Sequence, residues 1–438
     1  MPRRAFALAL GVGILAALTT PLPMAAEGRA LSLLKQAYAP PVGVPFPDDN
    51  PYSPAKQELG RQLFNEPALS ADGSFACATC HNPERGFTDG LRLGRGVPGQ
   101  ELPRHTPTLW NLAWAPALFW DGHADSLEQQ ARGPIDNPIE MAQPLPQGVA
   151  KLAADPAWPQ SFATAFPEAP TVDEVNVLAA LATYERTLVS PPTRFDRWVG
   201  GDRAALTAAE VQGFLLFNGK AGCAACHSGW AFTDHAFHDI GLPGIDPGRG
   251  RAIGLPAADH AFKTPGLREL ARTAPYMHDG RFATLDQVLD HYAGGIIDRP
   301  TLSPDLRRLV LTATERSQLL AFLATLTTET PGPVPVVVAP PPPPELIAAT
   351  DLVQQRDRQF APRHVRLTAG QPLTVVNDDT RTHNIRIAEP NLAFDSGAQE
   401  PGQKVEVPFP SAGRYHLFCG IHPTMKLTVD VEARAASQ

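Results

Sequence analysis

Two short segments each place a pair of cysteines one helical turn apart and follow the pair directly with a histidine. They are Cys77-Ala-Thr-Cys80-His81 and Cys223-Ala-Ala-Cys226-His227. Two thiols at this spacing can form thioethers with the two vinyl groups on one porphyrin edge, and the adjacent imidazole can then bind the iron. The segments therefore predict two covalently attached c-type haems, with His81 and His227 as proximal iron ligands.

The same cysteine pairs also invite two other interpretations, a zinc knuckle and a thioredoxin-like dithiol. Zinc would require both pairs to converge on one ion, and the histidine that follows each pair would then have no role. The fifth cysteine, Cys419, stands in a different setting. Each cysteine thus has a metal-centre role, and we expect no disulfide.

Cys419 belongs to a second kind of candidate metal site. His422 and Met425 follow it within one short loop, and His383 lies upstream. One thiolate, two imidazoles and one distant thioether are the ligand set of a blue, type 1 copper site. The spacing resembles that of amicyanin- and plastocyanin-type cupredoxins. The alternative is a metal-free sandwich with a buried free cysteine.

Two polar residues near this loop receive different predictions. Asn384 is placed to join the two ligand loops. Strand alternation puts Tyr415, Leu417 and Cys419 on one face, so we expect His416 on the opposite, exposed face and away from copper.

Roughly between residues 50 and 330 the chain resembles the bacterial di-haem cytochrome c peroxidase and MauG superfamily. The motifs that carry the resemblance are Phe-Trp-Asp-Gly at 119–122, Gly-Pro-Ile-Asp-Asn-Pro-Ile-Glu-Met at 133–141 and Ala-Pro-Tyr-Met-His-Asp-Gly-Arg at 274–281. The resemblance implies an oxidoreductase in which hydrogen peroxide reacts at the N-terminal haem. The C-terminal haem would then handle electrons.

The resemblance also implies roles for three further side chains. Glu140 matches the distal acid/base, which can move a proton between the two peroxide oxygens. Gln130 matches the distal amide that hydrogen-bonds the ligand, and Trp120 matches the indole between the haems. Taken singly, such a Glu is usually a solvated charge and such a Trp is usually core. Only the combined motif favours the functional roles.

Axial ligation separates the subtypes of this superfamily. Its peroxidases hold a second histidine on the peroxidatic haem, but residues 90–103 contain none, and Val97 stands at about the matching position. We therefore expect an open, five-coordinate first haem. For the second haem, Tyr292 matches the ligating tyrosine of MauG-like enzymes, with Met277 as the alternative. A phenolate would lower the haem potential relative to methionine.

The resemblance further implies a calcium ion between the haem domains. Its carbonyl ligands would match Thr273 and Pro275, but His105 stands where the family has a side-chain amide. Imidazole is a poor ligand for a hard cation. Calcium binding is therefore left open.

The elements that must hold the haem groups form a tandem pattern. Residues 60–65 and 213–218 precede the two cysteine pairs, and Phe-Thr-Asp follows each of them at 87–89 and 232–234. Segments with apolar residues at helical spacing surround these motifs, at 172–188, 207–217, 284–292 and 312–326. We expect two mainly α-helical cytochrome c-type haem domains, residues 27–200 and 201–330.

The rest of the chain has a different character. Residues 331–345 are rich in proline, which predicts an extended linker. Beyond it, β-branched residues alternate or cluster, which predicts an all-β cupredoxin sandwich at 346–434. Its expected strands include residues 365–368, 373–376, 384–387, 404–407, 415–418 and 426–431.

The N-terminus and the overall charge indicate where the protein works. Arg3 and Arg4 precede a short apolar run, and Ala25-Ala26 offers a cleavage site. Residues 1–26 therefore fit a secretion signal better than a membrane anchor, because the run is short and prolines interrupt it. A formal net charge of −8 excludes a nucleic-acid-binding protein. We expect a periplasmic protein that does not span the membrane once the signal is cleaved.

These observations together predict a peroxidase. Electrons for hydrogen peroxide would pass through the second haem and the copper domain, supplied by an external donor such as a small cytochrome c or a cupredoxin. The linker would let the copper domain swing at high effective concentration. Two alternatives remain, a MauG-like oxidase that modifies a partner protein and a non-enzymatic multi-centre electron carrier.

Overall fold

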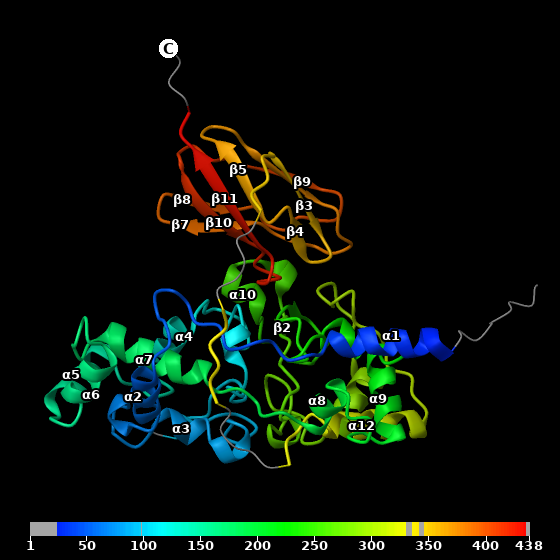
Figure 1. The fold of residues 1–438 in the computed structure, drawn as a ribbon, viewed down its shortest axis with the longest axis horizontal. Helices are drawn as coiled ribbons and strands as arrows, with labels where there is room; N and C mark the ends of the chain where they lie inside the picture. Colours follow the sequence, from blue (N-terminus) through cyan, green and yellow to red (C-terminus); the bar gives the residue numbers. More distant parts are fainter. Residues whose placement is uncertain (1–23, 98, 330–334, 341–345, 435–438) are drawn as a thin grey trace, which may run out of the picture.

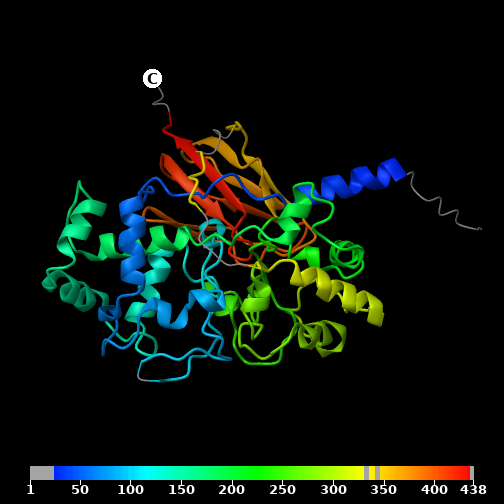
Figure 2. The ribbon, with the colours of Figure 1, turned by 60° about the horizontal axis from the view of Figure 1, so that its bottom comes forward.

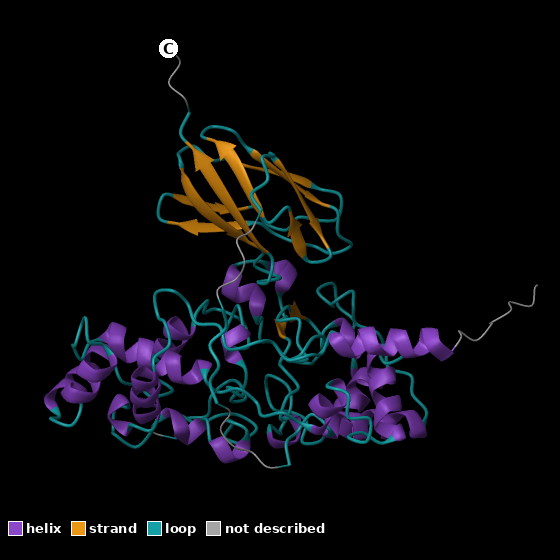
Figure 3. Ribbon diagram, viewed as in Figure 1, coloured by secondary structure: helices purple, strands orange, loops and turns teal. Residues whose placement is uncertain are grey.

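The computed structural model describes residues 24–97, 99–329, 335–340 and 346–434. The predicted secretion signal lies almost wholly outside the described residues. A broad helical part carries a β-sandwich on one side, and its two helical groups lie at opposite ends (Figures 1 and 3). The predicted fold class is confirmed. No helix of the described ranges is long and apolar enough to cross a bilayer.

The first helical unit is built on two helices that approach each other closely. Ser53 caps the start of helix α2 (Pro54–Phe64), since its side chain accepts the Lys56 N–H. This helix packs on α7 (Glu174–Arg186). The contact needs Gly60, because a Cβ there would lie 2.0 Å from the Ala180 carbonyl oxygen. The other helices of this unit are α3 (Cys77–Cys80), α4 (Leu127–Asp136), α5 (Leu145–Ala154) and α6 (Pro159–Ala165).

The second unit repeats this contact. Helix α9 (Ala208–Asn218) packs on α12 (Ala313–Ala324), and a Cβ on Gly213 would lie 2.0 Å from the Gln318 carbonyl oxygen. The shared geometry is what a tandem duplication predicts. This unit also holds α8 (Arg194–Val199), α10 (Arg249–Ile253), α11 (Leu285–Asp290) with a π-helical turn (His291–Gly295), and the strands β1 (Phe237–His238) and β2 (Phe262–Lys263).

The second core reaches beyond the predicted domain boundary at residue 200. Tyr38 packs among its phenylalanines, and its hydroxyl donates to the Asn218 side chain at 2.7 Å. Phe195 and Trp198 of α8 also belong to this core. Helix α1 (Met24–Gln36) accordingly lies against the second unit (Figure 1). The N-terminal segment thus belongs with the second unit because its aromatic anchor is buried there.

The copper-type domain is a sandwich of two sheets with strand orders β5-β11-β10-β7-β8 and β4-β3-β6-β9. Apolar side chains from both sheets form one core, which includes Val353, Tyr415 and Val429. The strands are β3 (Leu352–Arg356), β4 (Gln359–Ala361), β5 (His364–Thr368), β6 (Leu373–Asn377), β7 (Arg386–Glu389), β8 (Leu392–Asp395), β9 (Lys404–Val407), β10 (Gly413–Phe418) and β11 (Lys426–Glu432).

The described part of the proline-rich linker is bound to the helical part. Val44 donates its N–H to the Val337 carbonyl at 2.6 Å and accepts the Ala339 N–H at 2.9 Å. The remaining linker residues lie outside the described ranges. We call the segment from Cys419 to Met425, which holds three of the predicted copper ligands, the copper loop. The sandwich sits with the end that carries this loop on the second unit, next to α10 (Figures 1 and 2). The structure therefore shows a docked domain where the sequence predicts a swinging one.

Candidate redox centres

The first cysteine pair lies on a single helical turn that points its histidine inward. Cys77 and Cys80 begin and end α3, and His81 follows at the helix end. The Nδ1 atom of His81 lies 3.0 Å from the Phe87 carbonyl oxygen, which a left-handed backbone turn at Phe87 directs toward the ring. With Nδ1 donating to this carbonyl, the Nε2 lone pair of His81 stays available for a metal.

The second pair repeats this arrangement. Cys223 begins a short 3₁₀ turn, and the Nδ1 atom of His227 lies 3.0 Å from the Phe232 carbonyl oxygen. Phe232 also has a left-handed backbone, with φ 55°. Burial lowers the pKa of both His81 and His227, so both imidazoles are neutral and able to bind a metal. Two related sites thus hold their imidazoles in the same way.

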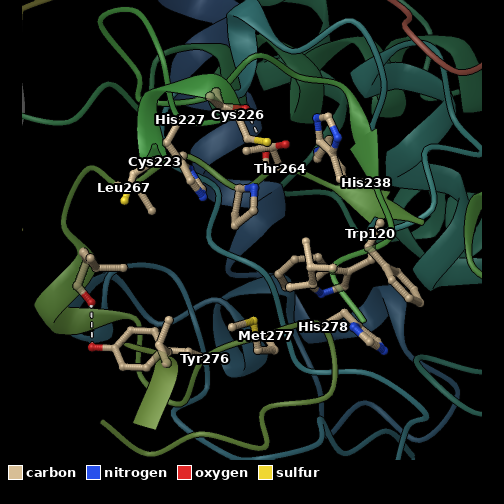
Figure 4. A pocket seen from close by; sticks show the side chains of 18 of the residues that line it. Trp120, Cys223, Cys226, His227, His238, Thr264, Leu267, Tyr276, Met277 and His278 are labelled. Carbon is tan, nitrogen blue, oxygen red and sulfur yellow. Dashed lines mark hydrogen bonds between the residues drawn. The ribbon is translucent and has the colours of Figure 1, made fainter. Parts of the chain in front are cut away.

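A large cavity opens beside the second pair. Figure 4 shows Cys223, Cys226 and His227 at one end of the cavity and Tyr276 with Met277 at the other. The lining is mostly apolar, but it includes Lys263, whose ammonium donates to the Ala117 carbonyl at 3.1 Å. Burial lowers the pKa of Lys263 to about 8.

The residues around this cavity fit a haem. Two thiols and a free imidazole nitrogen line an apolar space, and the buried Lys263 cation would be stabilised by a carboxylate such as a propionate. Both candidate axial ligands, Tyr292 and Met277, line the same space. Burial raises the pKa of Tyr292, so an iron would have to stabilise its phenolate. The choice between Tyr292 and Met277 stays a prediction.

Trp120 lies at the boundary between the two units. It also lines the second cavity, and its indole Nε1 donates to the His105 carbonyl at 2.8 Å. Its own carbonyl accepts the Lys263 N–H at 2.8 Å. Trp120 is therefore held by its indole in the first unit and by its backbone carbonyl at β2 of the second, and its place between two haems stays a prediction.

The expected calcium ligands do not make a site for a hard cation. Thr273 and Pro275 line the second cavity, but the Nδ1 atom of His105 lies 2.8 Å from the Leu91 carbonyl oxygen. The His105 ring thus makes a hydrogen bond at the position where the resemblance implies an amide oxygen. Among the described residues, neither cluster of metal-type ligands includes His105. This donor set does not fit calcium.

Glu140 lies close to the first cysteine pair. Burial and the charges of Asp89 and Glu140 raise the pKa of Cys80 to about 11. Asn137 donates its side-chain N–H to the Glu140 carboxyl at 3.1 Å, and burial raises the pKa of Glu140. A carboxyl whose pKa is raised holds a proton and passes it on more readily than an ordinary carboxyl does.

The other distal positions are filled in different ways. Val97 is buried and donates its N–H to the Glu140 carbonyl at 2.7 Å, so an apolar side chain stands at about the position of the missing histidine. Gln130 lies half-buried on α4, on the segment that leads to Glu140. Glu140 therefore lies at the first site, whereas Gln130 lies on the helix that precedes it.

The copper-type ligands form a compact buried cluster. The Nδ1 atoms of His383 and His422 lie 3.0 Å apart, and the Cys419 Sγ lies 3.8 and 3.7 Å from them. Met425 is also buried. One thiol and two imidazole nitrogens that face one another at these distances fit a single type 1 copper ion.

Hydrogen bonds around the cluster hold its ligands in place. Asn384 accepts the Gly420 N–H at 2.6 Å, which is the predicted link between the two ligand loops. The Nε2 atom of His383 lies 3.1 Å from the Asp379 carboxylate, so its Nδ1 is left for a metal. Sequence reasoning missed Asp379, although its position four residues before His383 was a usable signal. His416 is exposed beside Glu389, as predicted.

The comparisons with known proteins agree with both parts of this geometry. Residues 54–204 match the di-haem cytochrome c peroxidase family model, and residues 349–432 match the plastocyanin/azurin family of copper-binding proteins. The methylamine utilization protein MauG of Methylorubrum extorquens is 48% identical over 69% of this chain and 87% of that protein. The chain belongs to the di-haem cytochrome c peroxidase and MauG family.

Other members of the family are similar over the same region. The cytochrome c551 peroxidase of Nitrosomonas europaea is 36% identical over 63% of this chain and 80% of that protein. A crystal structure of a MauG-like protein associated with microbial copper homeostasis is 35% identical, with a TM-score of 0.62, and the match covers 67% of this chain and 94% of that one. The predicted class, an oxidoreductase of the cytochrome c peroxidase type, is confirmed. The two family matches support haem and copper as cofactors.

Proposed function

We propose that the protein is a periplasmic di-haem peroxidase that reduces hydrogen peroxide with electrons delivered through its second haem site and its fused copper domain. The observation that carries this proposal is Glu140, a half-buried carboxyl of raised pKa beside the first cysteine pair. Val97, at about the place of the missing histidine, offers no ligand that could close the site.

Each proposed centre has its own residues. Cys77, Cys80 and His81 would hold the first haem, and Cys223, Cys226 and His227 would hold the second, with Tyr292 as its axial partner. His383, Cys419, His422 and Met425 would hold one copper. When bound, these groups supply a peroxide-accepting iron and one-electron exchange.

The residues of the chain account for the proton movements. Glu140 takes a proton from one peroxide oxygen and returns it to the departing oxygen. Gln130 donates a hydrogen bond that orients the peroxide, and Trp120 bridges the two units. Each peroxide consumes two electrons and two protons and leaves two waters, so the copper domain must deliver two electrons in turn. An external one-electron carrier would supply them.

The experiment that tests this function uses the fully metallated chain. Replacing Glu140 by Gln keeps the shape of the side chain but removes the exchangeable carboxyl proton. We expect peroxide turnover to fall by roughly 100-fold or more while both haem spectra remain. The control is Glu168→Gln, since Glu168 is exposed in a loop. An unchanged rate in the Glu140→Gln variant would remove Glu140 from the mechanism.

A second candidate function is a MauG-like oxidase that modifies a partner protein. The buried Val97 at about the missing histidine position and the presence of Tyr292 in the second cavity favour it. The two functions differ in where oxidising equivalents go. Rapid steady-state turnover with a reduced small donor supports the peroxidase, whereas equivalents that persist until a partner protein is added support the oxidase.

A further inference from the structure

The copper-loop end of the sandwich faces the second haem site. His422 is only 4% exposed, and the charges acting on its ring include those of His238 and Asp234 in the second unit. Both of these residues lie beside Cys226, and their ligand-type atoms fall within 4.8 Å of its Sγ. The copper ligand on the loop and the attachment edge of the second haem are therefore neighbours.

Arg358 makes the central contact of this interface. Its guanidinium pairs with the Asp234 carboxylate and also donates to the Ala225 carbonyl, which lies between Cys223 and Cys226. Asp234 in turn lies 2.9 Å from the Nε2 atom of His238. A side chain of the copper domain thus reaches the loop that would carry the second haem.

The backbone at Arg358 gives an independent indication of its role. Asp357 and Arg358 form the two-residue turn between β3 and β4, and both have left-handed backbones, with φ 51° and 58°. Such turns normally use Gly, which has no Cβ, or Asn, whose short polar side chain tolerates a left-handed backbone. A strained arginine persists where its side chain is needed, and the ion pair with Asp234 supplies that need.

Two more arginines hold the same interface. Arg381, two residues before the copper ligand His383, forms a two-pronged ion pair with Asp305 of the second unit. Arg249 of α10 donates to the Gly420 carbonyl in the copper loop at 2.7 Å. It also donates to the Asp121 carbonyl at 3.0 Å, next to Trp120.

The environment of Arg249 shows what keeps it in place. It is 4% exposed, and among the described residues its guanidinium donates only to carbonyl oxygens. Burying a cation without a carboxylate is costly. Its bonds to the copper loop and to the Trp120 motif offset part of that cost, together with the Phe237 ring, whose centroid lies 4.3 Å from the guanidinium carbon. The docked domain thus supplies one of the contacts that stabilise the buried Arg249 cation.

A path of hydrogen bonds and side-chain atoms leads from a copper ligand to a histidine beside the second cysteine pair. His383 contacts Asp379, and Asp379 accepts the backbone N–H of Arg358 at 2.9 Å. The Arg358 side chain then reaches Asp234, which contacts His238 beside Cys226. Short bonded steps of this kind suit the passage of an electron without large rearrangement.

We propose that Arg358, Arg381 and Arg249 clamp the copper domain in one docked position, where the His422 edge meets the Cys226 edge of the second haem site. Electron transfer then occurs inside a fixed complex within one chain. Each passage oxidises one cuprous ion and reduces one ferric iron, with no bond made or broken. Only the use of these electrons to reduce peroxide rests on the proposed function. The docking of the copper domain does not depend on peroxide chemistry.

The test compares full-length, metallated variants. Arg358→Gly combined with Arg381→Asp removes two anchors, and glycine also suits the left-handed turn, so the sandwich should stay folded and keep its blue copper absorbance. We expect a larger radius of gyration in X-ray scattering. We also expect copper-to-haem electron transfer to slow by roughly tenfold or more, since it then depends on encounters along the tether.

Two further variants make the test sharp. Asp357→Gly relieves the same turn but removes an exposed side chain, so scattering and transfer should match the parent. Adding Asp305→Arg to the double variant restores the ion pair with its charges exchanged and should recover part of both properties. A double variant that stays as compact and as fast as the parent would overturn the clamp. Fast, clamp-dependent transfer without peroxide turnover would instead leave the clamp standing and count against the peroxidase.

Discussion

The indole Nε1 of Trp120 donates a hydrogen bond to the carbonyl oxygen of His105, with 2.8 Å between the two atoms. The backbone N–H of His105 in turn donates to the His278 carbonyl at 2.8 Å. The indole is therefore fixed to a segment that also ties the first unit to the second. A side chain that bridges two redox sites benefits from such fixation, because its orientation does not have to be found at each transfer.

Replacing Trp120 by Phe should slow electron exchange between the two haem sites. The phenyl ring keeps the apolar packing, but it cannot donate the hydrogen bond to His105 and it is smaller and less polarisable than the indole. We expect both haem spectra to remain and the exchange rate to fall by about tenfold, which corresponds to about 1.4 kcal/mol in the barrier. Stopped-flow measurement after partial reduction checks this. Trp158→Phe in the core of the first unit should leave the exchange rate unchanged.

The buried Glu185 carboxyl should make the stability of the fold depend on pH. Burial raises its pKa to about 8, while Arg186 lowers it and Glu128 raises it. Its Oε2 atom is buried without a hydrogen-bond partner. The pKa of Glu185 is thus higher in the folded chain, about 8, than in the unfolded chain, 4.5. Below pH 4.5 the carboxyl is protonated in both states and does not change the stability. As the pH rises from 4.5 to 8, the unfolded chain loses the proton more readily, so the free energy of unfolding falls.

The Glu185→Gln variant should therefore gain stability relative to the parent as pH rises. Between pH 4.5 and 7.5 we expect the difference in the free energy of unfolding to shift by about 3 kcal/mol in favour of the variant, since each pH unit between the two pKa values is worth about 1.4 kcal/mol. Denaturant unfolding of the metallated chain at both pH values measures it. A pH-independent difference would show that Glu185 is not held neutral in the fold.

Local signals predicted most of the elements that hold the sites. The helix predicted at 207–217 corresponds to α9, because Thr207 caps it and its apolar residues recur at helical spacing. The strand predicted at 404–407 matches β9. The strand predicted from residue 384 begins instead at Arg386, because Asn384 binds the copper loop and the Ile385 N–H donates to a Ser396 hydroxyl.

The docking of the copper domain could not be predicted in this way. Arg358 and Asp234 are far apart in the chain, and neither belongs to a periodic pattern or a ligand motif. Likewise, the core that Tyr38 joins is assembled from distant segments, so the order of the tandem motifs along the chain placed this residue in the first domain. Spacing rules identify ligands on one loop or one helical turn, but ion pairs between domains depend on tertiary packing.

Adding a methyl group at Gly213 should disrupt the contact between α9 and α12. A Cβ there would lie 2.0 Å from the Gln318 carbonyl oxygen, so α9 and α12 would have to separate. We expect Gly213→Ala to lower the free energy of unfolding by about 3 kcal/mol despite the better helix propensity of alanine. Gly60→Ala should behave alike in the first unit. The control is Gly294→Ala, where an added Cβ meets no atom within 4 Å.

The reduction potential of the second haem should show whether Tyr292 or Met277 is its axial ligand. A phenolate ligand stabilises the ferric state, and burial already raises the pKa of Tyr292, so only a bound iron can keep it ionised. Replacing Tyr292 by Met should raise the potential by on the order of 0.1 V, within the range of about 0.8 V over which axial ligands tune haems. Met277→Leu should leave it near the parent value. Redox titration with electron paramagnetic resonance of the low-spin signal measures both, and the reverse pattern would assign the ligand to Met277.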